Sequence, residues 1–264
     1  GVMLQTISAM GLLAVLIVTF RAGPPLKKEH GFKQVRPLLT VAALALSLAQ
    51  IAWCWGVADN LRQGVSLAVL PAGSQSAAVD LMLFGFFMAI GVAMSSRFFP
   101  LAFRMQLPQR RGLQVAAWLL AGGAILTTIG DLRPDFVLAG MSVGNWASLV
   151  YAGGLLAGTF AVRIFEARKP IPRVVLPYRV WQDPAAVGVL SAYIWVVAAA
   201  GLLLLFPLQS IGVQIPGQLL QRNLARHAIG IGFMTLLIIS VGWKMLPGFG
   251  GGRPRGGGWI WGAV

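Results

Sequence analysis

The chain has 264 residues, of which 57% are hydrophobic and only 11% are charged. Soluble domains carry about 25% charged residues, so this composition excludes a soluble globular protein and equally a disordered chain. A single cysteine, Cys54, excludes a disulfide scaffold and the cysteine-rich zinc and iron–sulfur frameworks. The apolar runs are too long and continuous for the strands of an outer-membrane barrel. We therefore expect an all-α, polytopic transmembrane helical bundle.

Seven apolar runs are long enough to cross a bilayer core of about 30 Å as helices. In chain order they lie at 2–20, 37–57, 80–101, 113–130, 144–163, 185–207 and 225–247. An eighth run begins at Trp259, and the chain starts at Gly1 instead of Met. We therefore expect both ends to be cut and the eighth span to be truncated. The first run has no basic segment before it, which favours a span over a signal peptide.

Basic residues concentrate in alternate loops between these runs. One set of loops holds 17 of the 21 Lys and Arg residues and three of the seven acidic residues. The positive-inside rule makes this set cytoplasmic, which predicts a bacterial inner-membrane protein with its N-terminus outside. The net charge of +14 then reflects membrane topology and contact with anionic lipid. We expect the lipid bilayer and no nucleic acid as a partner.

The third and seventh runs resemble each other at a constant offset of 147 residues. The pairs at this offset are Pro37 and Pro184, Gly85 and Gly232, Phe86 and Phe233, Arg97 and Lys244, and Pro100 and Pro247. Such a register predicts two parallel four-helix repeats, at residues 1–143 and 144–264. The first proline pair is expected to open helices and the last pair to end them.

Four residues are candidates for chemistry. His227 opens the seventh run, and a neutral imidazole is a common ligand of haem iron and copper. Arg97 and Lys244 either extend toward the headgroups or bind an anionic group such as a haem propionate. Asp80 occupies the place of His227 in the first repeat, where it either caps a helix or approaches His227 across a pseudo-twofold axis. The other histidine, His30, is expected to be a solvated loop residue.

These runs resemble a known family. The segment Arg226-His227-Ala228 to Gly232-Phe233-Met234, with the ending Met245-Leu-Pro247-Gly248, resembles the NnrS family, as does the earlier segment from Leu83 to Pro100. The resemblance implies a polytopic bacterial inner-membrane protein that contains haem and copper and is associated with nitric oxide and denitrification. His227 matches the family's histidine-glycine-phenylalanine helix. Asp80 stands where a second histidine would complete a bis-histidine site on these two helices.

Three functions remain open from the sequence. The first is a membrane protein that binds haem or metal, with His227 as an axial ligand, and handles or senses nitric oxide. The second is a non-catalytic membrane subunit of a larger respiratory or photosynthetic complex, which binds lipid and partner helices. Small residues such as Gly153, Gly154 and Gly158 would allow close helix packing in either case. The third is a transporter, which parallel repeats allow but which the few polar residues within the runs disfavour.

Overall fold

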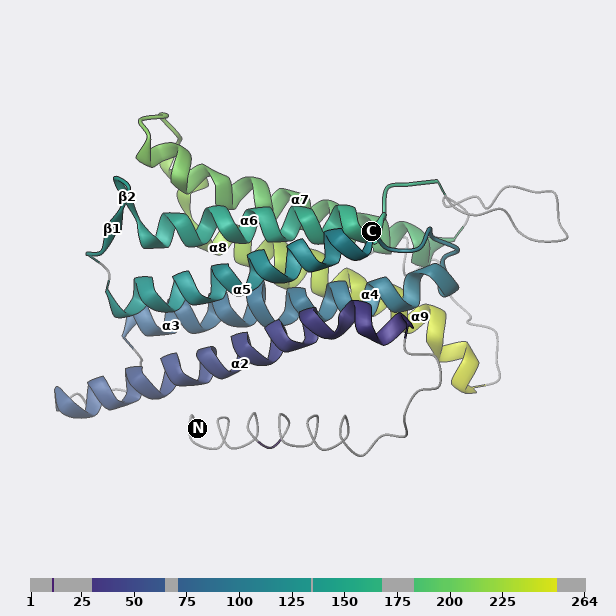
Figure 1. The fold of residues 1–264 in the computed structure, drawn as a ribbon, viewed down its shortest axis with the longest axis horizontal. Helices are drawn as coiled ribbons and strands as arrows, with labels where there is room; N and C mark the ends of the chain where they lie inside the picture. The colour runs from purple at the N-terminus through teal and green to yellow at the C-terminus, as the bar shows by residue number, and fades with distance from the viewer. Residues whose placement is uncertain (1–10, 12–29, 65–70, 134, 168–182, 251–264) are drawn as a thin grey trace, which may run out of the picture.

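A computed structural model describes residues 11, 30–64, 71–133, 135–167 and 183–250. The helices run side by side along one common direction and form an elongated bundle (Figure 1). The predicted first span at 2–20, apart from residue 11, and the predicted eighth span at Trp259 lie outside the described residues.

The described elements are almost all helical. The first are α2 (His30–Arg62), α3 (Ala72–Asp80), the π-helical segment η1 (Leu81–Phe87) and α4 (Met88–Ala102). Next come α5 (Arg110–Leu132), the short hairpin of β1 (Val137–Leu138) and β2 (Met141–Ser142), and α6 (Val143–Val162). The last are α7 (Pro184–Ser210), the 3₁₀ turn η3 (Gly217–Leu220), α8 (Arg222–His227), the π-helical segment η4 (Ala228–Thr235) and α9 (Leu236–Gly250). In both halves the α–π–α series forms one continuous helix.

Five of the described helices are long and apolar enough to cross a membrane. They are Gln34–Arg62, Ala72–Ala102, Arg110–Leu132, Pro184–Ser210 and Arg222–Met245. These helices confirm an all-α, multi-pass membrane protein, because each carries enough apolar residues to span a bilayer core. The helix predicted at 144–163 is also present as α6, although it is not among the five. Within the residues that the structure describes there are therefore five candidate spans, whereas the sequence predicted seven and the start of an eighth for the whole chain.

Glycines bring α5 and α6 into close contact. A Cβ on Gly123 of α5 would lie 2.6 Å from a ring carbon of Tyr151 on α6. A Cβ on Gly154 would lie 3.2 Å from the backbone nitrogen of Leu120, and one on Gly158 would lie 3.1 Å from a side chain of α4. Small residues let helices approach in this way, so two of the three glycines expected to serve packing do so.

Prolines fall at helix ends less strictly than the sequence predicted. Pro184 is the first residue of α7, with Asp183 as the capping residue, which confirms its expected role. Pro37, in contrast, lies inside α2, which begins seven residues earlier, so the prediction that it opens the helix is wrong. Helix α4 continues for two residues past Pro100 and α9 for three past Pro247. Because proline has no N–H, each of these two prolines removes one backbone hydrogen bond near the end of its helix.

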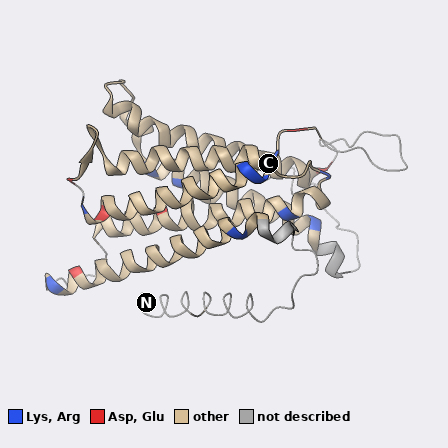
Figure 2. Cartoon of the chain, viewed as in Figure 1, with Lys and Arg blue, Asp and Glu red and all other residues tan. Residues whose placement is uncertain are grey.

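The charged residues of the described chain gather toward the two ends of the bundle (Figure 2). One end, called the basic end here, holds Arg36, Arg97, Arg104, Arg110, Arg111, Arg163 and Lys244 with Glu166 and Asp183. The other, called the mixed end, holds Arg62, Arg133, Arg222 and Arg226 with Asp59, Asp80, Asp131 and Asp135. The middle of the bundle is apolar, which suits the hydrocarbon core of a membrane.

Candidate functional site

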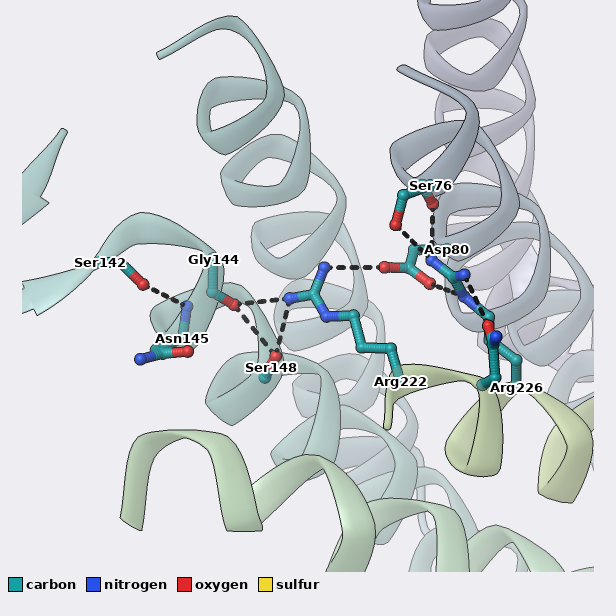
Figure 3. A network of polar contacts seen from close by, with 9 residues as sticks. Ser76, Asp80, Ser142, Gly144, Asn145, Ser148, Arg222 and Arg226 are labelled. Atoms are coloured by element: carbon teal, nitrogen blue, oxygen red, sulfur yellow. Dashed lines mark hydrogen bonds and ion pairs between the residues drawn. The ribbon is translucent and has the colours of Figure 1, made fainter. Parts of the chain in front are cut away.

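A buried carboxylate at the mixed end holds two arginines. Asp80 is the last residue of α3, and only 4% of its side chain is exposed. Its Oδ1 accepts a hydrogen bond from Nε of Arg226 at 2.7 Å, and its Oδ2 accepts one from Nη1 of Arg222 at 3.0 Å. The two arginines lie four residues apart on α8, so they share one helix face. The carboxylate thereby joins helices that are about 140 residues apart in sequence (Figure 3).

Each guanidinium is also held by other groups. Arg226 donates through Nη2 to the backbone oxygen of Ser76 at 3.0 Å and through Nη1 to the side chain of Asn223 at 3.0 Å. Arg222 donates through Nη2 to the backbone oxygen of Gly144 at 3.0 Å and to Oγ of Ser148 at 3.1 Å. Arg222 therefore ties α8 to α6 as well as to α3 (Figure 3). We call Asp80, Arg222 and Arg226 with these neighbours the Asp80 cluster.

Tyr151 lies below the cluster, toward the middle of the bundle. It follows Gly144 and Ser148 on α6 at positions i+7 and i+3, so the three residues face the same side of the helix. Its hydroxyl would lie 3.6 Å from a Cβ on Gly85 of η1. The hydroxyl is buried and makes no hydrogen bond to any residue that the structure describes. A buried hydroxyl without a hydrogen-bond partner is uncommon in folded proteins.

The interpretation of Asp80 as a helix cap is wrong. Asp80 lies well inside a continuous helix that begins at Ala72, eight residues earlier, and its side chain makes no capping hydrogen bond. The other alternative, in which Asp80 approaches His227 across a pseudo-twofold axis, is not seen in the hydrogen bonds. The carboxylate of Asp80 bonds to Arg222 and Arg226 instead. Two arginines at positions i and i+4, where a span begins, were a sequence signal for this pairing. They were counted only as charges of a loop between spans.

His227 lies on the outer surface of the bundle. Its side chain is exposed, and its Nδ1 lies 2.6 Å from the backbone oxygen of Asn223 one turn earlier. A carbonyl can only accept, so this contact places the proton on Nδ1. The other nitrogen, Nε2, makes no hydrogen bond within the described part of the chain and has its lone pair available. This is the tautomer in which histidine binds a metal through Nε2.

Arg97 and Lys244 lie at the basic end, far from His227. Lys244 follows His227 by 17 residues along one helix, which corresponds to about 25 Å at 1.5 Å per residue. The same spacing separates Arg97 from Asp80. Neither basic residue therefore lies close along its helix to the residue at the other end, and their binding of an anionic group stays a prediction.

Lys244 has a structural partner. Its Nζ lies 2.6 Å from Oδ2 of Asp183, and it also lies 5.6 Å from the ring centroid of Phe103. Asp183 in turn accepts hydrogen bonds from the backbone nitrogens of Ala185 and Ala186 at the start of α7. Lys244 thus joins the end of α9 to the start of α7. Arg97 is exposed and forms no ion pair with any described residue.

Metal ligands do not gather in the described helices. No group of three or more His, Cys, Asp or Glu side chains there is arranged to hold a metal ion. Cys54 is exposed on α2, and the side chain of His30 lies outside the described residues. Comparisons with protein-family models, with curated proteins and with solved structures find nothing that matches this chain.

Proposed function

We propose that this chain is a multi-pass protein of the bacterial inner membrane that binds haem through His227 and handles or senses nitric oxide. The observation that carries the proposal is the hydrogen bond between Nδ1 of His227 and the backbone oxygen of Asn223. A backbone partner on Nδ1 fixes the ring and leaves Nε2 free to bind iron, as in many histidine ligands of haem. The resemblance to the NnrS family implies the same residue as a ligand.

The described residues supply one candidate ligand for a haem, His227, and no second one. Asp80, which replaces a histidine in the first repeat, is bonded to two arginines and is not a second ligand. His227 is exposed, so a haem bound there needs cover from further protein, either outside the described residues or in a second subunit. The haem iron would supply the binding of nitric oxide, while His227 fixes the iron's position through its oriented ring.

Two parallel repeats are part of the proposal, and the π-helical segments support them. η1 covers residues 81–87, and η4 covers residues 228–235. An offset of 147 carries the first segment onto the second, which is the offset found between the two runs in the sequence. Each segment also packs against the helix before it in the same way, η1 on α2 and η4 on α7. π-helical turns are rare, so their recurrence at one offset favours a duplicated four-helix unit.

The proposed orientation follows the charges at the two ends. The basic end carries seven Lys and Arg residues with described side chains against two acidic ones, whereas the mixed end carries four of each. Positively charged loops stay on the cytoplasmic side, so the basic end faces the cytoplasm. The Asp80 cluster and His227 then lie near the outer surface of the membrane.

The test is the reduced-minus-oxidised visible spectrum of the protein purified in mild detergent. We expect a haem signal in the wild type and in His30→Ala, and its loss in His227→Ala. His30 is a matched control because it is the other histidine of the chain. A flat spectrum in folded wild-type protein, or an unchanged spectrum in His227→Ala, would contradict haem binding at His227.

A second candidate is a non-catalytic subunit of a larger respiratory or photosynthetic complex. The Asp80 cluster favours it, because the buried charges bond to one another and tie α3, α6 and α8 together. Such bonding stabilises a scaffold without taking part in chemistry. Stable co-purification of partner chains with a haem-free protein would support this candidate, and a haem signal that depends on His227 would speak against it.

A further inference from the structure

The Asp80 cluster carries one more positive than negative charge. Two guanidinium groups meet a single carboxylate, since the ion pairs of Arg222 and Arg226 both go to Asp80. Arginine stays protonated at any pH that the folded protein experiences, so the excess cannot be removed by titration. An excess charge near the apolar part of a membrane protein is costly unless an opposite charge lies close to it.

No other carboxylate among the residues that the structure describes supplies that opposite charge. The sequence has seven acidic residues: Glu29, Asp59, Asp80, Asp131, Asp135, Glu166 and Asp183. Asp183 and Glu166 pair with Lys244 and Arg163 at the basic end. The three remaining aspartates of the mixed end form no ion pair with Arg222 or Arg226. Glu29 lies outside the described residues.

Arg222 is the accessible member of the cluster. Its side chain is 31% exposed, compared with 16% for Arg226. It is held on three sides, by Asp80 of α3, by Gly144 and Ser148 of α6, and by the ring of Phe206 at 5.7 Å. Its Nε donates to no described residue, whereas all three nitrogens of Arg226 are used. A fixed guanidinium with an unused donor is well suited to bind an anion, because little side-chain entropy is lost.

We propose that Arg222 binds a monovalent anionic group at the mixed end of the bundle. Two sources offer the same chemistry: a small dissolved anion such as chloride, and the phosphodiester of an anionic lipid headgroup. The bound anion brings the cluster to neutrality and locks α3, α6 and α8 in place. The site does not depend on haem at His227, so it is tested separately from the proposed function.

The experiment uses the chain purified in detergent and depleted of lipid, with thermal unfolding followed by tryptophan fluorescence. Potassium chloride replaces potassium gluconate at constant ionic strength, and in a second arm phosphatidylglycerol replaces phosphatidylcholine in mixed micelles. Binding to the folded state raises the unfolding midpoint by mass action. We expect a saturable rise of roughly 5 °C in at least one arm, and the arm that responds identifies the source.

The variants assign the effect to Arg222. Arg222→Gln is expected to abolish the rise, while Arg133→Gln, an exposed arginine of the same end, is expected to retain it. If Arg222→Gln does not fold, Arg222→Lys keeps the charge without the planar fork and is expected to need a several-fold higher anion concentration. The proposal is overturned if neither arm shifts the wild type, or if the Arg222 variants respond as the wild type does.

Discussion

Asp80→Ala is the sharpest test of the cluster as a structural element. Removal of one partner from a buried ion pair costs about 3–5 kcal/mol, because the remaining charge keeps its desolvation cost without compensation. Here the Arg222 side chain is 31% exposed and is partly solvated once released, so most of the cost arises at Arg226, which is 16% exposed. We therefore expect a loss at the lower end of that range, about 3 kcal/mol.

The assay is SDS-induced unfolding in mixed micelles, followed by circular dichroism, as a double-mutant cycle with Arg226→Met. In the double variant the more buried of the two uncompensated charges is gone and only the partly exposed Arg222 remains, so the effect of Asp80→Ala should fall by about 1.5 kcal/mol or more in the Arg226→Met background. Glu166→Ala, which breaks the exposed pair with Arg163, serves as the control and should leave the transition unchanged. A coupling energy below about 0.5 kcal/mol would refute the view that the buried carboxylate holds α8 through Arg226.

Three further predictions concern stability in the same assay. Gly123→Ala should cost about 1–3 kcal/mol, because its Cβ would lie 2.6 Å from the ring of Tyr151; Gly201→Ala, with nothing within 4 Å, should cost nothing. Tyr151→Phe should change the free energy of unfolding by less than about 1 kcal/mol, because the buried hydroxyl has no described partner to lose; a larger loss would reveal one. Lys244→Met should cost at most about 1 kcal/mol, because the pair with Asp183 is partly exposed and the aspartate keeps its capping hydrogen bonds; a loss above 2 kcal/mol would contradict this.

The sequence predicted helices better than it predicted where they begin. The helix predicted at 80–101 begins earlier, at Ala72. The sequence did not indicate this start, because residues 72–80 are small or polar and carry no long apolar stretch. Their helix is stabilised by burial of Ser74, Ala77 and Ala78 against neighbouring helices, which no local pattern reveals. Similarly, α2 extends before Pro37 although a proline there predicts a start.

Of the Asp80 cluster, the sequence singled out the carboxylate and missed both arginines. Asp80 was recognised as important, but its partners come from α8, and only the folded bundle brings Arg222 and Arg226 to it. The match of Arg97 with Lys244 at the repeat offset indicates equivalent places in two repeats. It does not say which residues are neighbours in space, and 17 residues separate Lys244 from His227 along their helix.

The two π-helical segments have a consequence for how each long helix presents its faces. A π turn accommodates one residue more than an α turn, and one residue corresponds to about 100° of rotation around the helix axis. η1 begins directly after Asp80, and η4 begins directly after His227. The part of each helix before its π-helical segment is therefore out of phase with the part after it, so the two parts direct their side chains differently. Deletion of one residue from either π-helical segment would leave the helix as hydrophobic as before. It would nevertheless turn the polar residue that precedes the segment, Asp80 or His227, away from its present neighbours.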